Sequence, residues 1–500
     1  MSIHFITVLG TSLYTDCIYA IEGTEFAYNT PFAQMATLNY IVSVCGKCDR
    51  ITVFVTEKAE EKNWYTREYT EKECQDLERR KLEVKSGQLK IGLKQMMEEE
   101  FPDTIIESIR IREGRNKEEI NEIFEFMYDA IQPDETIYFD FTHGLRNIPM
   151  QALTVIHYAK VLKNIQVGGM YYGAFELGEK KEDGSFYVNL LNMSACSAIL
   201  DWTNAADSFI KGGSSNQIEK LYKERVRPGR EEQYSTRTLE RLCDLTNCLN
   251  TSRGKAGKNG RSSIQKAYEY FKINYIEMQK SLHRISERPL LRLFDKIEED
   301  VKIFDRKCYS CKGEREVYLE NTATGMAAVE WAIRKGLTQQ GFTALEETIK
   351  TYLCEAYEIP AEEELTRDSI VGSTVKFLAN RYNDAKKSAK DKQVLSGDEW
   401  IMLNIDKLKK SRREELYANN GFQELPESER KFYLQKVDEM MPNLSMDLIN
   451  LTLNTAGLRN TLNHFGFQKD EIDYRKFQRK LEELFKKLKE IMEEEHVVWE

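Results

Sequence analysis

Near the end of the chain, three polar residues on one predicted helix could together perform acid–base chemistry on a phosphodiester. Arg459 and Asn460 are adjacent, and His464 follows Asn460 by four residues, so Asn460 and His464 share one helix face. A histidine can move a proton near neutral pH, which contributes about 10²–10⁴ in rate. Arginine can stabilise charge on the phosphorane, and asparagine can orient the phosphate or the ribose. This trio suits metal-independent cleavage of RNA by attack of its own 2′-hydroxyl.

The segment that carries these residues is predicted to be an amphipathic helix over 446–465. Apolar residues recur there at three- and four-residue spacing and would bury one stripe: Leu444, Leu448, Leu451, Leu458, Leu462 and Phe465. A plainer interpretation stays open, in which His464 only ends the helix before Gly466, where a cationic imidazole meets the helix dipole. Because one histidine cannot easily serve as both acid and base, an active site would need a symmetric pair of chains.

Two loops in the first third of the chain carry residues suited to binding a phosphate or a ribose. The first contains Gly10, Thr11 and Ser12, and the second contains Thr142, His143, Gly144, Arg146 and Asn147. Glycine lets backbone approach a ligand, and the second loop opens a predicted helix whose N-terminal amides favour an anion. The first loop could equally be an ordinary turn after a strand, whereas the dense polarity of the second is costly unless a ligand or network satisfies it. The GxGxxG dinucleotide fingerprint is absent, so a dehydrogenase is not expected.

The elements that would position these loops alternate between strand and helix. Short apolar runs predict strands over 5–9, 51–55, 136–141 and 166–172, with helical patterns between them, such as 31–45 and 149–162. Buried strands separated by helices predict a parallel sheet of Rossmann type, with ligands beyond its carboxyl edge. A hairpin is expected to turn at Asp183-Gly184. Strand signals nearly vanish after about residue 200. We therefore predict an α/β domain over 1–200, an all-α linker over 201–320 and an all-α domain over 321–500.

Composition narrows the function classes. The 500 residues include 72 Lys and Arg against 82 Asp and Glu, a net charge of −10, which does not suit a protein that coats long nucleic acid. No membrane-spanning apolar run and no signal peptide are evident, so a cytoplasmic location without a membrane partner is expected. The ten cysteines include CxxC pairs at 45–48 and 308–311. Because these pairs fall in different predicted domains, ordinary thiols are favoured over a shared zinc site, and no metal or cofactor is predicted.

Taken together, the two groups of residues resemble a known family. The Gly10-Thr11-Ser12 loop and the loop over 140–147 are similar to those of the CRISPR-associated Rossmann fold (CARF) domain. The Arg459-Asn460-x3-His464 segment resembles the RxxxxH signature of HEPN ribonucleases, and 331–347 looks like an early HEPN helix. In this order they resemble the type III CRISPR accessory ribonucleases of CARF–HEPN architecture. The region 201–320 matches only as a variable helical linker.

The resemblance implies a homodimer with two kinds of site. Paired CARF domains would bind a cyclic oligoadenylate messenger as allosteric activator, and paired HEPN domains would form one composite site that cuts single-stranded RNA to 2′,3′-cyclic phosphate products. The residues implied to line the messenger pocket are Gly10, Thr11, Ser12, His143, Gly144, Arg146 and Asn147, and the implied catalytic residues are Arg459, Asn460 and His464. The CARF domain could also cleave its own ring slowly, with Thr11, Ser12 and His143 positioning a ribose 2′-hydroxyl.

Two alternatives keep the same N-terminal domain. A messenger-responsive DNA-binding transcriptional regulator would need a compact helix-turn-helix with a basic recognition helix after residue 200. The acidic balance and the long helical C-terminus do not favour it, although 253–261 is locally basic. A metal-dependent DNA nuclease would need clustered carboxylates on a strand-rich domain. The ring size of the messenger and the base preference of the cut are not predicted by the sequence.

Overall fold

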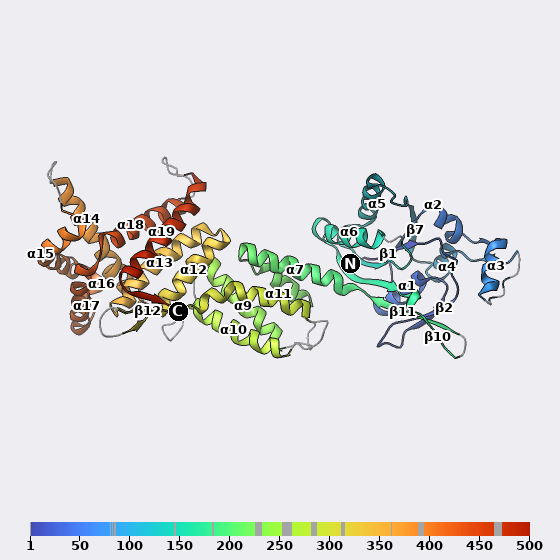
Figure 1. Cartoon of the computed structure of the whole chain (residues 1–500), viewed down its shortest axis with the longest axis horizontal. Coiled ribbons are helices and arrows are strands. Elements are labelled where there is room, and N and C mark those ends of the chain that lie inside the picture. The colour runs from blue at the N-terminus through green and yellow to red at the C-terminus, as the bar shows by residue number, and fades with distance from the viewer. Residues whose placement is uncertain are drawn as a thin grey trace. The chain divides into compact units, whose positions relative to one another are not determined.

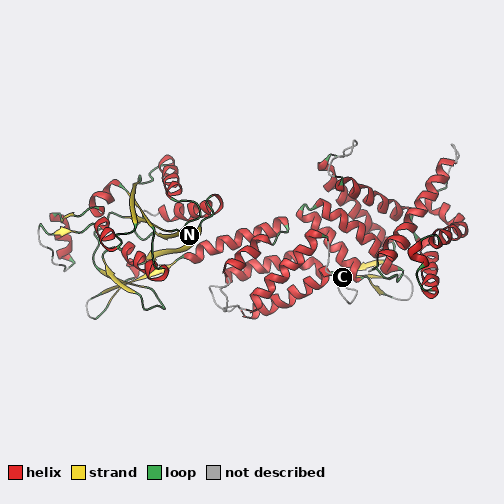
Figure 2. Ribbon diagram, turned by 180° about the vertical axis from the view of Figure 1, so that it is seen from behind, coloured by secondary structure: helices red, strands yellow, loops and turns green. Residues whose placement is uncertain are grey.

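The computed structural model describes residues 2–80, 82, 84, 87–144, 147–182, 185–225, 233–252, 263–281, 288–311, 316–361, 363–388, 395–464 and 473–500. The chain forms two compact units, Met1–Leu200 and Asp201–Glu500, with the boundary inside helix α7 (Ser194–Gly212) (Figure 1). Strands and helices mix in the first unit, and helices dominate the second (Figure 2). Within these ranges, no helix has the length and apolar character that crossing a membrane requires.

A nine-stranded mixed sheet forms the first unit. Its main path runs β3 (Ala27–Thr30), β2 (Cys17–Ala20), β11 (Phe186–Asn192), β9 (Gln166–Gly173), β8 (Thr136–Asp140), β1 (Ile3–Leu9), β4 (Arg50–Val55) and β7 (Ile105–Arg110), and β10 (Glu179–Lys180) pairs with β11. The five strands from β9 to β7 are parallel, as predicted. The prediction is wrong beyond β9, because β11 runs antiparallel to β9, and β2 and β3 extend that edge. β2 and β3 are only four residues long, too short for a clear periodic signal.

The buried central strands explain why this sheet forms. Along β1, alternate residues enter opposite cores: Ile6 and Val8 pack with α5 (Lys117–Ala130) and α6 (Ile148–Leu162), whereas Phe5 and Leu9 pack with α1 (Ala33–Cys45) and α4 (Leu93–Glu100). Helices α1 and α6 confirm the helices predicted over 31–45 and 149–162. The expected hairpin is present as β10–β11, while its predicted turn at Asp183-Gly184 lies outside the described residues.

Register places the candidate loops at one edge of the sheet. Thr7 of β1 pairs with Asp140 of β8, and Leu9 pairs with Val55 of β4, so these three parallel strands end together. The stretch after β4 adds α2 (Glu57–Ala59), the π-helical turn η1 (Glu60–Trp64), α3 (Glu71–Arg79) and a small pair of strands, β5 (Arg67–Glu68) and β6 (Leu89–Lys90). A 3-10 turn, η2 (Phe175–Leu177), follows β9.

Two hydrophobic cores build the second unit. One joins α7 with α8 (Asn216–Arg225), α9 (Gln233–Thr251), α10 (Ser263–Ser281), α11 (Arg288–Val301) and η4 (Lys302–Asp305). The other joins α13 (Thr338–Ala356), η5 (Leu365–Gly372), α14 (Ser373–Ser388), α15 (Gly397–Tyr417), α16 (Asn420–Gln423), α17 (Glu427–Met440), η6 (Met441–Asn443), α18 (Met446–Asn463) and α19 (Tyr474–Glu494). Helix α12 (Glu320–Lys335) supplies Trp331 to the first core and Val329 to the second. Because α12 serves both cores, the region expected as a linker over 201–320 shares one compact unit with 321–500.

Two features of the second unit differ from what its sequence predicted, namely a small sheet and a break between two helices. The region that was expected to be all-α contains a small three-stranded sheet. Its strands, in order, are β13 (Val317–Tyr318), β12 (Cys308–Ser310) and β14 (Val497–Trp499). Strands of two or three residues are too short to show periodicity. The segment 331–347, expected to be one early HEPN helix, instead spans two helices, because Gly336 takes a left-handed φ of 68° and ends α12 before α13 begins.

Candidate functional site

A cavity of about 770 Å³ opens at the carboxyl edge of β1 and β8. The loop after β1, the loop after β8, the turn after β9 and the segment 62–80 each contribute to its wall. This is the edge at which ligands bind in open sheets of parallel strands. Four of the predicted binding residues line it: Thr11, Ser12, Thr142 and His143.

A glycine brings the two predicted loops into contact. A Cβ atom on Gly10 would lie 2.7 Å from the carbonyl oxygen of His143 and 2.7 Å from the hydroxyl of Tyr14, which is too close for any other residue. Buried Asp140 holds the second loop, since its Oδ1 accepts from the backbone N–H of Thr142 at 2.9 Å and its Oδ2 accepts from the hydroxyl of Thr37. Burial raises the pKa of Asp140. Part of the dense polarity of this loop is therefore satisfied internally.

Two polar groups at the cavity have no such partner. The rings of His143 and Tyr14 lie 4.4 Å apart, centroid to centroid. Nε2 of His143 and the hydroxyl of Tyr14 are buried without a hydrogen-bond partner among the described residues. Burial lowers the pKa of His143 to about 4, so its ring is neutral at neutral pH, and burial raises the pKa of Tyr14. An unsatisfied buried polar group costs about 1–3 kcal/mol, which a ligand with matching groups would recover.

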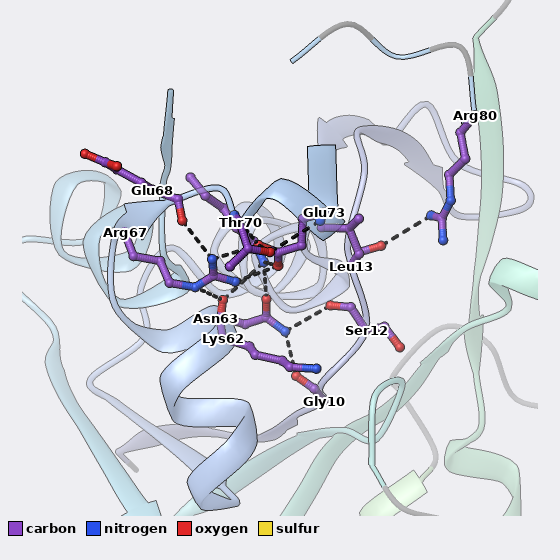
Figure 3. A network of polar contacts seen from close by, with 11 residues as sticks. Gly10, Ser12, Leu13, Lys62, Asn63, Arg67, Glu68, Thr70, Glu73 and Arg80 are labelled. Atoms are coloured by element: carbon purple, nitrogen blue, oxygen red, sulfur yellow. Dashed lines mark hydrogen bonds and ion pairs between the residues drawn. The ribbon is translucent and has the colours of Figure 1, made fainter. Parts of the chain in front are cut away.

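A polar network fixes the loop after β1 from the side of the segment 62–80 (Figure 3). Nδ2 of Asn63 donates to the carbonyl oxygen of Gly10 at 2.8 Å and to that of Ser12 at 3.0 Å. Oδ1 of Asn63 accepts from Nζ of buried Lys90 at 2.6 Å. Lys90 also donates to the carbonyl oxygen of Lys62 at 3.1 Å. One amide thus sets the path of the predicted ligand loop.

The cationic side chains of the cavity wall differ in whether they form ion pairs. Arg67 forms a bidentate pair with Glu73 at 2.6 and 2.8 Å, and Glu73 also closes the capping box of α3 with Thr70. This pairing holds the pKa of Glu73 far below its usual value. Lys62, Lys72 and Arg80 also line the cavity, and none of them forms an ion pair within the described part of the chain. Among the described residues, the side chain of Arg80 makes one long hydrogen bond, of 3.5 Å, to the carbonyl oxygen of Leu13. These three cations give the wall capacity for an anion, beside the acidic Glu68, Asp76 and Glu176.

The remaining predicted residues lie elsewhere. Gly10 is not among the lining residues, although Asn63 binds its carbonyl oxygen beside the cavity. Gly144 packs against Ile148, and the side chain of Asn147 lies beside Gly114, so neither is placed as a lining residue. Arg146 lies outside the described residues. Tyr14 and the cations of 62–80 were not predicted from the sequence. The Thr70-x-x-Glu73 capping box was a readable helix signal, but no sequence pattern linked that helix to the loop after β1.

The predicted catalytic residues occupy the last turns of α18. Ser445 caps its start by accepting from the backbone N–H of Leu448, and the expected apolar stripe is buried or partly buried over the described residues. Nη2 of Arg459 donates to Oδ1 of Asn460 at 3.2 Å, and His464 is the exposed C-cap residue. The plainer interpretation of His464 is thus right about its position. Its exposed imidazole nevertheless remains available to a substrate.

A buried carboxylate that the sequence analysis missed contacts the arginine of this group. Oε2 of Glu346, in α13, lies 2.9 Å from Nε of Arg459, and its side chain is 7% exposed. No group of three or more His, Cys, Asp or Glu side chains in the described part of the chain could hold a metal ion. The groups that the arrangement itself brings together are an imidazole, an amide and a guanidinium.

The lowered pKa of His143 predicts a pH-dependent stability. In the unfolded chain this histidine binds a proton near pH 6.5, but in the folded chain only near 4. The unfolded state therefore binds more protons between these values, and the stabilising contribution present above 6.5 is lost as the pH falls toward 4. His143→Phe, which keeps a ring against Tyr14 and cannot titrate, should lose less stability between pH 7 and pH 5 in calorimetry. An equal loss in both proteins would contradict the burial of a neutral His143.

Comparison with known proteins agrees with the fold of the first unit. Residues 4–176 match the family described as "CRISPR system endoribonuclease Csx1, CARF domain". The chain is 21% identical over 379 residues to the CRISPR-associated protein MJ1674 of Methanocaldococcus jannaschii, covering 72% of this chain and 54% of that protein, so it spans about half the length of this relative. A weak likeness links it to Enterococcus italicus Csm6 bound to cyclic hexa-2′-fluoro-hexa-dAMP, with a TM-score of 0.30 and 12% identity over 98% of this chain and 93% of that one. By this match, the first unit carries a CARF domain over residues 4–176.

Proposed function

We propose that this protein is a single-stranded RNA endoribonuclease of type III CRISPR defence, acting in the cytoplasm and activated by a cyclic oligoadenylate bound to its CARF domain. The observation that carries the proposal is the grouping of Arg459, Asn460 and His464 at the accessible end of α18, in a chain whose first unit is a CARF domain. With a second histidine from another copy of the chain, these groups could cut RNA by acid–base catalysis without a metal ion.

In the proposed reaction, the RNA supplies its own nucleophile. His464 takes the proton of a ribose 2′-hydroxyl, whose oxygen then bonds to the adjacent phosphorus. Arg459 stabilises the charge of the phosphorane, and Asn460 orients the phosphate. The bond from phosphorus to the 5′-oxygen breaks, and that oxygen takes a proton from the histidine of a second copy. The products are a 2′,3′-cyclic phosphate and a 5′-hydroxyl.

Several features of the cavity support a cyclic oligoadenylate as its ligand. Lys62, Lys72 and Arg80 offer cations to a polyanionic ring, and charge-assisted bonds to phosphate are among the stronger hydrogen bonds. Phe175 and Tyr14 offer aromatic surface for a base. The unpartnered Nε2 of His143 and hydroxyl of Tyr14 are groups that the bases or riboses could satisfy.

A homodimer is part of the proposal, and an exposed apolar face of α6 supports it. Met150, Val161 and Leu162 of that helix are 75, 82 and 55% exposed, and Tyr158 is 47% exposed. Large apolar side chains exposed on one helix favour association with a partner surface. A second copy of the chain would cover this face and supply the second histidine that the chemistry needs.

Slow cleavage of the ring by the CARF domain is a second proposal. Thr11, Ser12 and His143 line the same cavity, and Nε2 of His143 is unpartnered among the described residues. The lowered pKa of His143 makes it a weak base. Any ring cleavage would therefore be slow compared with the cutting of RNA, and would end activation gradually.

The proposed function predicts RNA cleavage in a chelator. Labelled single-stranded RNA should be cut in EDTA when a tri-, tetra- or hexa-adenylate ring is added, and His464→Ala should abolish the cutting without weakening ring binding. His496→Ala, in the turn after α19, is the matched control and should cut normally. Loss of cleavage in EDTA or 5′-phosphate products would contradict the mechanism. Ring-dependent binding of duplex DNA without RNA cleavage would indicate a transcriptional regulator instead.

The cavity predicts which cations the messenger contacts. Arg80→Ala should raise the ring concentration for half-maximal activation about tenfold or more, because it removes a charge-assisted contact with a phosphate. The maximal rate should return at high ring concentration, since α18 is unchanged. Arg79→Ala is the matched control, because Arg79 pairs with Asp76 at 3.3 Å and does not line the cavity. Equal midpoints for the two variants would place the messenger elsewhere.

A further inference from the structure

We propose that Glu346 is the positioning residue of the nuclease site and holds the guanidinium of Arg459 in the orientation that meets the scissile phosphate. The inference rests on the proposed function and concerns a residue 113 positions before Arg459 in the sequence. It follows from three features of the contact between α13 and α18: which edge of the guanidinium is bound, how the carboxylate is itself held, and how exposed each side chain is.

The carboxylate contacts the inner edge of the guanidinium. Oε2 of Glu346 lies 2.9 Å from Nε of Arg459, as an ion pair rather than an aligned hydrogen bond, while Nη2 of Arg459 reaches Oδ1 of Asn460. The Glu346 side chain is 7% exposed and that of Arg459 is 28% exposed, so the ion pair is sheltered on one side and open on the other. An arginine held at Nε keeps its outer nitrogens for a second anion, and its planar fork suits a phosphate.

A second cation keeps the carboxylate in place. Oε1 of Glu346 lies 3.3 Å from Nζ of Lys350, one turn later on α13. Lys350 is 14% exposed and is also bound by Asp368 at 2.7 Å, from the π-helical segment η5. The pKa of Lys350 is raised by these carboxylates despite its burial. Each oxygen of Glu346 therefore faces one cation, and the carboxylate has little freedom to turn.

This arrangement explains why an amide would not replace the carboxylate. A glutamine side chain at position 346 would be almost isosteric, but whichever way it turned, its NH2 group would face either Lys350 or Arg459. Lys350 would still keep Asp368 and Glu347, at 2.7 and 3.2 Å, so the packing of α13 against η5 has other support. The change therefore acts mainly on Arg459. A loosened guanidinium must then be ordered anew each time the transition state forms.

The test compares Glu346→Gln with Glu347→Gln in the full-length protein under ring activation. Glu347 is the matched control, because it has the same charge and also pairs with Lys350, but binds Arg367 at 2.6 Å rather than Arg459. Glu346→Gln should lower kcat for RNA about tenfold or more, whereas Glu347→Gln should stay within about twofold. Glu346→Asp, which restores the charge at shorter reach, should recover part of the loss. Equal rates for the two glutamine variants, or no recovery with Glu346→Asp, would overturn the inference.

A double-mutant cycle of RNA affinities distinguishes a positioning role of Glu346 from a general role in folding. It does not depend on turnover. RNA with 2′-fluoro groups lacks the attacking hydroxyl, and its affinity is measured for wild type, Glu346→Gln, Arg459→Ala and the double variant. Glu346→Gln should weaken binding severalfold when Arg459 is present and change it less than about twofold when Arg459 is absent. The same weakening in both backgrounds would overturn the inference. If the wild-type protein binds RNA but does not cut it, that result contradicts the proposed function alone. The coupling between Glu346 and Arg459 in RNA binding can still be measured and still tests the inference.

Discussion

Parallel pairing of β1 with β4 on one side and β8 on the other determines what the first unit can do. It brings the carboxyl ends of the three strands to one edge, so that the loops after β1 and β8 must share space. That space is so narrow that only glycine fits at position 10, opposite the backbone of His143. Asn63 then binds two carbonyl oxygens of the first loop, and the cations of 62–80 reach the same cavity. The cavity at this edge is a direct consequence of strand order.

In the second unit, packed helices rather than paired strands bring the candidate site residues together. Helix α12 is buried on two sides and joins two cores, and its end at Gly336 sets the start of α13. Helix α13 in turn presents Glu346 to Arg459 across its contact with α18. A charged pair that is partly withdrawn from water gives a more fixed geometry than one at the surface, because fewer side-chain orientations remain and solvent screens it less. Under the proposed function, an arginine that contacts a phosphate benefits from such support.

How far the sequence predicted this structure depends on the length and burial of each element. β1, β4, β8 and β9 were readable as continuous apolar runs, and α18 as an apolar stripe, because these patterns directly reflect burial. β2, β3 and the small β12–β14 sheet were missed, because they are too short for periodicity. Thr142 and His143 were placed at the cavity because residues after a parallel strand face its ligand edge. Glu346 and Arg80 could not be found that way. A charge on a helix or a surface segment normally indicates solvent, and only tertiary contacts give these two their partners.

In the proposed function, two chains build one RNA-cutting site, and each contributes His464. The most direct test mixes wild-type chains with His464→Ala chains in varied proportions, allows them to exchange, and measures ring-activated RNA cleavage at constant total protein. A composite site predicts activity that follows the square of the wild-type fraction, about one quarter of the full rate in an equal mixture, because only pairs of wild-type chains are competent. A linear decline, with about one half of the rate in that mixture, would show that each chain cuts alone and would rule out a composite site.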